Sequence, residues 1–266
     1  MTMDRSFPAS PPVIIGATGG SGTRVVARMV RRLGVFIGAN LNESEDTAEL
    51  FEFYDRWINR FVLRDIAPLC LEEERLLRRD FSECIRRHHG GNSSASDFWG
   101  WKEPRSIYLL PLFFSIWPEM KFIHVIRDGR DMAFSANQNQ PRKHGGAVLR
   151  DLAQVSPQVR AARLWARVNL DAVGFCREHL QGRYLVVRFE DICAEPRQWC
   201  AEIARFLGVD HPDLDACASE VTPPQSIGRW RNEEPSMLSL ITEATRQALT
   251  AFGYESVPAH PLHHVH

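Results

Sequence analysis

A short apolar run that leads into a glycine-rich turn, and then at once into a helical pattern, is the most constraining feature of this sequence. The run covers 13–15, and four glycines stand between positions 16 and 22. Glycine carries an entropic cost unless the backbone needs a positive φ or a close approach. Strand, turn and helix in this order direct backbone N–H groups and the positive helix end towards one point. We therefore expect an oxyanion site, phosphate or sulfate, rather than a tight connection that binds nothing.

The turn does not match the loop of ordinary nucleoside-triphosphate hydrolases. That motif, G-x-x-x-x-G-K-[ST], places a lysine at the phosphates, whereas Gly22 here is followed by Thr23 and Arg24. Ser21 and Thr23 can each cap the helix and contact the same anion as the backbone from Gly19 onward. An ATP- or GTP-hydrolysing enzyme is disfavoured. A P-loop kinase remains an alternative that would also need a magnesium-binding carboxylate at a strand end.

Composition and charge narrow the class of protein. The chain has 266 residues, is 44% hydrophobic and carries a formal net charge of −1, which favours one globular domain over 12–258 with flexible tails at 1–11 and 259–266. A charge this small attracts neither nucleic acid nor an anionic membrane as a whole. No apolar run of about 18 residues and no leader pattern occur, which predicts a cytoplasmic protein without a membrane span. The six cysteines lack a CxxC pair, and we expect no metal site.

Strands and helices alternate along the chain. Expected strands cover 12–16, 35–38, 98–102, 121–126 and 184–189. Expected helices cover 22–33, 47–57, 71–87, 106–117, 157–179, 196–207 and 236–252, and a further helix follows 126 to about 137. Mobile loop is expected at 90–97, an irregular surface insertion at 137–156 and loop at 222–235. The alternation predicts a three-layer, P-loop-like α/β fold with a central parallel sheet and helices on both faces.

A second group of residues follows the other predicted strands. Arg127 comes directly after the strand 121–126, and Ser135 lies eight residues further on, where a guanidinium and a hydroxyl can meet one phosphate from two sides. The alternative is a surface ion pair between Arg127 and Asp131. Lys102 ends another strand, although its ammonium could simply extend into solvent. Ligands of parallel α/β sheets bind beyond the carboxyl ends of the strands, so these residues and the glycine turn can converge.

Together these motifs resemble the sulfotransferase family, which uses 3′-phosphoadenosine-5′-phosphosulfate (PAPS). The family's 5′-phosphosulfate loop typically reads (Lys/Arg)-Ser-Gly-Thr and resembles 20–23 here, and its paired Arg and Ser for the 3′-phosphate match Arg127 and Ser135. The family's Tyr-Glu-Asp-Leu…Pro stretch, whose aromatic lies against adenine, resembles 189–196.

The resemblance is nearest to the tyrosylprotein-sulfotransferase-like branch and extends over about 12–261. It rests on Lys-Glu-Pro at 102–104, Ile-Arg-Asp-Gly-Arg at 126–130, Arg-Trp at 229–230 and Phe-Gly-Tyr at 252–254.

The resemblance implies an in-line transfer of the sulfuryl group from PAPS to a hydroxyl or amine acceptor, which leaves PAP and needs no metal. The implied cofactor-binding residues are Gly19, Gly20, Ser21, Gly22, Thr23, Arg24, Arg127, Ser135, Phe189 and Arg229. Lys102 would neutralise charge on the leaving oxygen. The branch takes its general base from a glutamate after the second strand. Asn40 stands at that register, so the candidate bases are Glu43 first and Asp46 second, unless these acids only begin a helix.

Gly20 departs from the family pattern, because a basic residue normally stands there. Either Lys102, with Arg24, supplies the missing positive charge, or the chain is a non-catalytic nucleotide-binding protein of the same fold. The acceptor stays open among carbohydrate, lipid, peptide tyrosine and small hydroxylated metabolites, and so does the oligomeric state.

Overall fold

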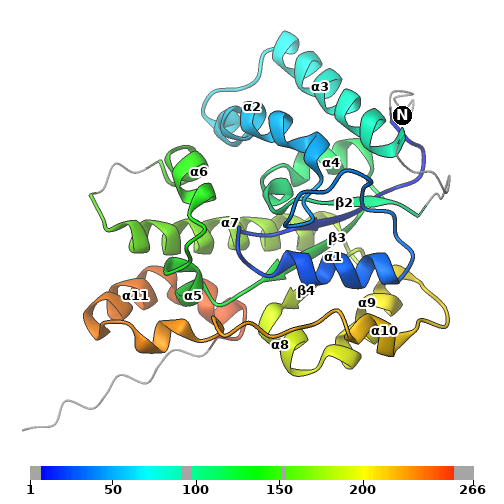
Figure 1. Ribbon diagram of the computed structural model, residues 1–266. Helices are drawn as coiled ribbons and strands as arrows, with labels where there is room; N and C mark the ends of the chain where they lie inside the picture. Colours follow the sequence, from blue (N-terminus) through cyan, green and yellow to red (C-terminus); the bar gives the residue numbers. More distant parts are fainter. Residues whose placement is uncertain (1–6, 91–97, 151–153, 255–266) are drawn as a thin grey trace, which may run out of the picture.

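A four-stranded parallel sheet lies at the centre of the computed structural model, which describes residues 7–90, 98–150 and 154–254 (Figure 1). The strands are β1 (Val13–Gly16), β2 (Gly100–Lys102), β3 (Lys121–Ile126) and β4 (Tyr184–Arg188). Their order is β2-β1-β3-β4, and every neighbouring pair is parallel. From β1 the chain passes to β2 on one side of it, and then returns to β3 and β4 on the other side. The strand order therefore reverses between the adjacent strands β1 and β3. Such a reversal is where α/β sheets bind ligands.

Helices cover both faces of the sheet, which confirms the predicted three-layer α/β fold. Alternate side chains of a strand point to opposite faces, so Ile14 and Ile15 belong to different hydrophobic clusters. Ile14 packs against the layer of α2 (Phe51–Val62), α3 (Leu71–Gly90), α4 (Leu110–Ile116) and α7 (Pro157–His179). Ile15 packs against the layer of α1 (Thr23–Arg32), α9 (Pro196–Leu207) and α10 (Leu214–Ala218).

Several shorter helices and 3₁₀ turns complete the described fold together with α11. They are the helices α5 (Gly129–Ala133), α6 (Asn139–Leu149), α8 (Phe189–Ala194) and α11 (Pro235–Ala251) and the 3₁₀ turns η1 (Ala48–Leu50), η2 (Leu63–Asp65), η3 (Pro104–Tyr108) and η4 (Arg229–Asn232). α11 lies along α7, with α5 beside it (Figure 1). Across the described ranges, no helix combines the length and the apolar character that a membrane crossing requires.

Two expected elements differ from the structure. The segment 35–38 is not a strand of the sheet, because Phe36 makes a single bridge to Trp99 between the positive-φ residues Gly34 and Gly38. The expected irregular insertion at 137–156 contains α6. Pro141 and the glycine pair at 145–146 suggest a break, but an added Cβ at Gly145 would lie 3.2 Å from Arg160 Nε. Gly145 therefore lies close to the Arg160 side chain of α7 and does not break the helix.

Smaller corrections concern the ends of elements. The helix after β3 ends at Ala133 rather than near 137, and the expected helix 106–117 is divided into η3 and α4. The expected flexible lead-in is packed where it is described, since the Phe7 ring lies 5.3 Å from Trp117 and Pro8 O accepts a hydrogen bond from Trp117 Nε1 (2.8 Å). The loop 91–97, residues 1–6 and the tail 259–266 lie outside the described residues.

Candidate active site

The four strand ends bring the candidate residues to one edge of the sheet. β1 ends at Gly16 and enters the glycine turn, β2 ends on Lys102, Arg127 follows β3, and Phe189 follows β4. All four strands are parallel, so these positions share one edge even though they are far apart in sequence. The convergence expected from the sequence is present.

The glycine turn leaves the amino end of α1 open. Gly20 and Gly22 have φ values of 91° and 85°, which only glycine adopts readily. Gly22 occupies the N-cap position, and within the described chain no side chain caps α1. The hydroxyl of Ser21 donates instead to Thr18 O (2.7 Å) and is buried, so Ser21 closes the turn rather than capping the helix. The first N–H groups of α1 are thus available to an anion.

Neighbouring elements hold the turn tightly. A Cβ at Gly22 would lie 2.2 Å from the ring of Phe189, so the phenyl ring packs directly on the backbone there. A Cβ at Gly20 would lie 3.3 Å from Ser135 Oγ, which places this hydroxyl beside the turn. Only 3% of Phe189 is exposed. Its ring therefore supports the turn and also lies 5.6 Å from the guanidinium carbon of Arg127.

Arg127 is a buried cation with spare hydrogen-bonding capacity. Its Nη2 donates to Asp131 Oδ2 (3.1 Å), to Ser226 Oγ (3.2 Å) and to Ser226 O. Its Nε is buried and has no hydrogen-bond partner among the described residues. The pair with Asp131 is buried rather than at the surface, because the two side chains are 5% and 1% exposed. The Arg127 guanidinium thus keeps one donor that the described residues do not use.

Asp131 shapes the segment that carries Arg229. It accepts hydrogen bonds from Gly228 N (2.7 Å) and Trp230 N (3.1 Å). Arg229 then donates through Nε to Ser226 O (3.2 Å), the same carbonyl that Arg127 contacts, and through Nη1 to Phe134 O (3.3 Å). Burial and the nearby Arg127 lower the pKa of Arg229. Both guanidinium groups therefore lie at the Ser226 carbonyl, and that of Arg229 also reaches Phe134. The sequence predicted only a loop at 222–235 and gave no role to 226–228.

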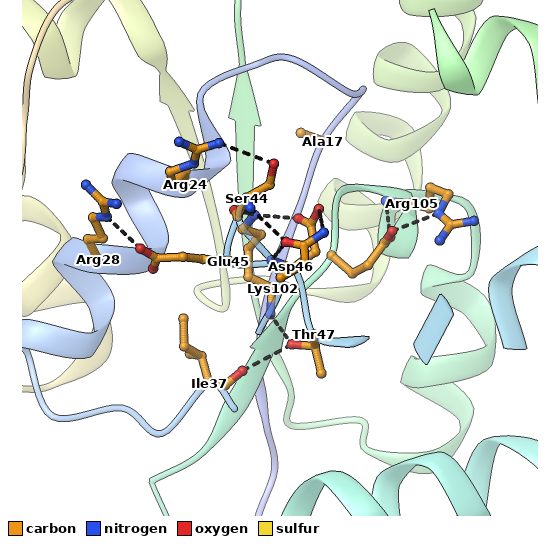
Figure 2. A network of polar contacts seen from close by, with 12 residues as sticks. Ala17, Arg24, Arg28, Ile37, Ser44, Glu45, Asp46, Thr47, Lys102 and Arg105 are labelled. Atoms are coloured by element: carbon orange, nitrogen blue, oxygen red, sulfur yellow. Dashed lines mark hydrogen bonds and ion pairs between the residues drawn. The ribbon is translucent and has the colours of Figure 1, made fainter. Parts of the chain in front are cut away.

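Lys102 ends the outermost strand, β2, and its side chain is buried rather than extended into solvent (Figure 2). Its Nζ lies 2.5 Å from Asp46 Oδ1 and 2.5 Å from Ser44 O, and 1% of its side chain is exposed. Burial lowers the pKa of Lys102, and the Asp46 carboxylate opposes that effect. Glu43 is exposed and makes no hydrogen bond or ion pair with the described residues. The structure thus joins Asp46, and not Glu43, to Lys102.

The loop 42–46 is tied to α1 and to itself. Asn42 Oδ1 accepts from the backbone N–H groups of Ser44 and Asp46, both at 2.8 Å. Arg24 Nη2 donates to Ser44 Oγ (3.3 Å), so this predicted cofactor residue contacts the loop in Figure 2.

A cavity of about 240 Å³ borders both the glycine turn and this loop, and Gly19 and Asp46 line it. Its wall includes Gln140 and His144 from α6, which sequence reasoning missed. Their spacing of one helical turn is the signal that could have found them. Gln140 accepts from Tyr108 Oη (3.0 Å) and donates to Ala17 O (3.4 Å), which fixes α6 on the turn.

Fold and site define a P-loop-like α/β protein whose active edge carries an open helix N-terminus, a buried lysine and a pair of converging arginines. A model described as "Sulfotransferase family" matches residues 12–213, and the chain belongs to this family. The resemblance stated from the motifs is thereby confirmed at the family level. No curated protein matches the chain.

Solved structures of sulfotransferases share the fold at low sequence identity. STF9 from Mycobacterium avium has a TM-score of 0.59 and 10% identity, with 93% of this chain and 78% of that chain covered. The sulfotransferase domain of the Synechococcus PCC 7002 olefin synthase has a TM-score of 0.54 and 17% identity, with 96% and 98% covered. Mouse SULT7A1 complexed with PAP has a TM-score of 0.51 and 14% identity, with 94% and 91% covered.

Proposed function

We propose that this protein transfers the sulfuryl group of PAPS to a hydroxyl-bearing acceptor and releases PAP. The observation that carries the proposal is that two groups suited to anions lie apart on one sheet edge. One is the uncapped start of α1 with its positive-φ glycines, and the other is the pair Arg127 and Arg229 beside Ser135. A nucleotide with charged groups at both its 5′ and 3′ ends suits this arrangement. The mouse relative in the comparison was solved with PAP, which agrees with this choice.

The residues present fit such a donor. The backbone from Gly19 to Thr23 would hold the 5′-phosphosulfate, and the orphaned Nε of Arg127 would bind the 3′-phosphate with Ser135 and Arg229. Phe189 supports the turn beneath Gly22. The adenine contact that the family resemblance implies would require its ring to become uncovered, because it is almost fully buried.

Asp46 and Lys102 are the groups that can perform the chemistry. Bound PAPS would supply a sulfuryl group, whose bond to the 5′-phosphate oxygen breaks as a bond to the acceptor oxygen forms. Asp46 would take the acceptor's hydroxyl proton, and Lys102 would neutralise the negative charge that develops on the leaving oxygen. Glu43, the first candidate from sequence, lacks this contact, so we assign the base to Asp46. Lys102 would also replace the cation missing at Gly20.

The first test is calorimetric titration of PAP into the wild type and into Arg127→Ala. We expect wild-type binding and a loss of about 10²-fold or more in the variant, because a buried charged donor to phosphate is removed. Arg167→Ala is the matched control, since that arginine forms an exposed pair with Asp171. It should bind PAP as the wild type does. No binding by the wild type, or equal binding by Arg127→Ala, contradicts the donor assignment.

The second test separates catalysis from binding. Lys102→Met keeps most of the side-chain volume and removes the charge. Transfer from radiolabelled PAPS to a library of hydroxylated acceptors should fall by about 10²–10³-fold, as when one preorganised electrostatic donor is deleted. PAP affinity should stay within about threefold. Transfer at the wild-type rate would remove Lys102 from the mechanism, whereas PAP binding by the wild type without any transfer would favour the non-catalytic alternative.

A further inference from the structure

We propose that the cavity beside Asp46 binds a neutral, polyhydroxylated acceptor of about monosaccharide size, and that Nε2 of His144 accepts a hydrogen bond from one of its hydroxyl groups. The inference rests on the proposed function, because the cavity borders Gly19 of the glycine turn and Asp46, the assigned base. Its volume of about 240 Å³ lies below the range of roughly 300–1,000 Å³ that is typical for drug-sized ligands.

The charges in the cavity wall are already matched. Asp55 accepts from Lys143 Nζ (2.7 and 2.9 Å) and from Arg105, and Glu103 accepts from Arg105 Nε (2.7 Å). Asp46 is paired with Lys102 outside the wall. Each described carboxylate of the lining therefore has a cationic partner. A charged acceptor would meet no free counter-charge, and burying an unpaired charge is costly.

Most side chains in the wall are polar, which favours a polyhydroxylated acceptor over a lipid or a simple phenol. Among the described residues that line it, Phe51 and Pro104 are the two apolar side chains. The side-chain amides Asn42, Asn137, Asn139 and Gln140 contribute polar surface. Ligand sites for apolar molecules are lined mainly by hydrophobic side chains. Amides around a single aromatic ring instead suit a molecule that carries several hydroxyl groups.

The network around His144 determines which of its nitrogens carries hydrogen. Asn59 Nδ2 donates to Lys143 O (2.9 Å), which orients Asn59 Oδ1 towards His144 Nδ1 at 2.8 Å. Nδ1 must therefore carry the hydrogen, and Nε2 presents a lone pair. Burial lowers the pKa of His144 to about 4, so the ring is neutral at pH 7.

Nε2 of His144 is an acceptor without a donor. The residue is 2% exposed, and this atom has no hydrogen-bond partner in the described part of the chain. A buried polar atom left unpaired costs free energy. A hydroxyl bound in the cavity would recover that free energy once the side chains that cover Nε2 move aside. A site of this kind discriminates strongly against analogues that lack the hydroxyl. The geometry thus selects for a hydroxyl donor as well as for neutrality.

The test measures direct binding to the enzyme saturated with PAP, by saturation-transfer NMR and calorimetry. Methyl β-glucoside and myo-inositol are the neutral probes, and methyl β-glucuronide, glucosamine and 4-nitrophenol are the anionic, cationic and phenolic comparisons. We expect the neutral probes to bind at least tenfold more tightly than the other three. Tighter binding of a charged or phenolic probe, or no binding of either neutral probe, would overturn the inference.

The same titrations keep this inference distinct from the proposed function. Polyol binding by a protein that does not bind PAP would support the cavity assignment and contradict the donor assignment. PAP binding without polyol binding would do the reverse.

Variants at His144 test the hydrogen bond itself. His144→Phe keeps a ring but removes the acceptor, and it should weaken methyl β-glucoside binding about tenfold with PAP affinity unchanged. His144→Gln keeps an acceptor oxygen and should recover part of the affinity. His179→Phe is the control, because that half-buried histidine packs on Phe175 outside the cavity. Wild-type polyol affinity in a folded His144→Phe would exclude the hydrogen bond.

Discussion

Glu45 holds Asp46 and Lys102, the proposed catalytic pair, in place although it neither lines the cavity nor hydrogen-bonds to Lys102 Nζ. It adopts a left-handed backbone conformation (φ 60°), which costs a residue with a side chain about 1–2 kcal/mol. Its carboxylate accepts from Arg28 Nε (2.6 Å) and from Arg31 Nη1 (3.5 Å) on α1. The strained position directs the flanking Ser44 carbonyl and Asp46 carboxylate to Lys102 (Figure 2). Glu45 is therefore a positioning residue.

Glu45→Gln should lower kcat about tenfold and leave PAP affinity within about threefold, because the loop loses its ion pairs while the nucleotide site is unchanged. Steady-state kinetics with labelled PAPS provide the measurement. Glu43→Gln is the matched control, since Glu43 is two residues away, is exposed and has no hydrogen bond or ion pair with the residues that the structure describes. It should behave as the wild type. If Glu43→Gln abolished transfer instead, the base would be Glu43 and our assignment of Asp46 would be wrong.

At the scale of elements, the contact between Gly22 and Phe189 joins the β1–α1 turn to the start of α8. The phenyl ring occupies the space where any side chain at position 22 would stand. The residue that follows β4 thus fixes the shape of the glycine turn that follows β1. Arg127 after β3 contacts the same ring, so three strand ends are linked through one side chain.

Gly22→Ala should destabilise the protein by about 2–4 kcal/mol and abolish PAP binding, because the methyl group clashes with the ring in addition to the strain of positive φ. Gly34→Ala isolates the strain, since Gly34 has φ 90° but no atom within 4 Å of an added Cβ. We expect it to cost about 1 kcal/mol with normal PAP binding. Urea unfolding measures both. Equal destabilisation by the two substitutions would refute the packing argument.

For the whole molecule, a buried histidine couples stability to pH. His124 on β3 bonds Asn169 Oδ1 of α7 (2.7 Å) and Tyr184 Oη of β4 (2.8 Å). Asn169 Nδ2 donates to Trp165 O (2.7 Å), so His124 Nε2 carries the hydrogen and Nδ1 accepts from Tyr184. Burial lowers the pKa of His124 from 6.5 to about 4. The neutral ring satisfies both partners.

Because its folded pKa lies below its unfolded value, the unfolded chain takes up the proton first as pH falls. The stabilisation from neutral His124 is complete above pH 6.5 and is lost between 6.5 and about 4. The loss approaches about 1.4 kcal/mol per pH unit, and His144 adds to it in the same direction. Urea unfolding from pH 7 to 4 should show a smaller slope for His124→Gln than for the wild type. Identical slopes would contradict this account.

Local signals in the sequence determined the strand–turn–helix at 13–32, the parallel α/β class and the long helices. The bounds of α7 and α9 agree with expectation because each helix carries its own boundary residues. Ser156 caps α7 ahead of Pro157, and Gly208 in a left-handed conformation ends α9 after its start at Pro196. Such signals act over a few residues, so the sequence alone is sufficient to place them.

The tertiary structure decided which neighbours meet. The sequence ranks Glu43 ahead of Asp46 as a candidate base, whereas the turn set by Asn42 and by the arginines of α1 brings Asp46 to Lys102. The spare acceptor of His144 exists because Asn59 on α2 occupies the other ring nitrogen. Long-range hydrogen bonds and burial choose among chemically similar side chains. Those choices depend on how distant elements pack, which local patterns do not encode.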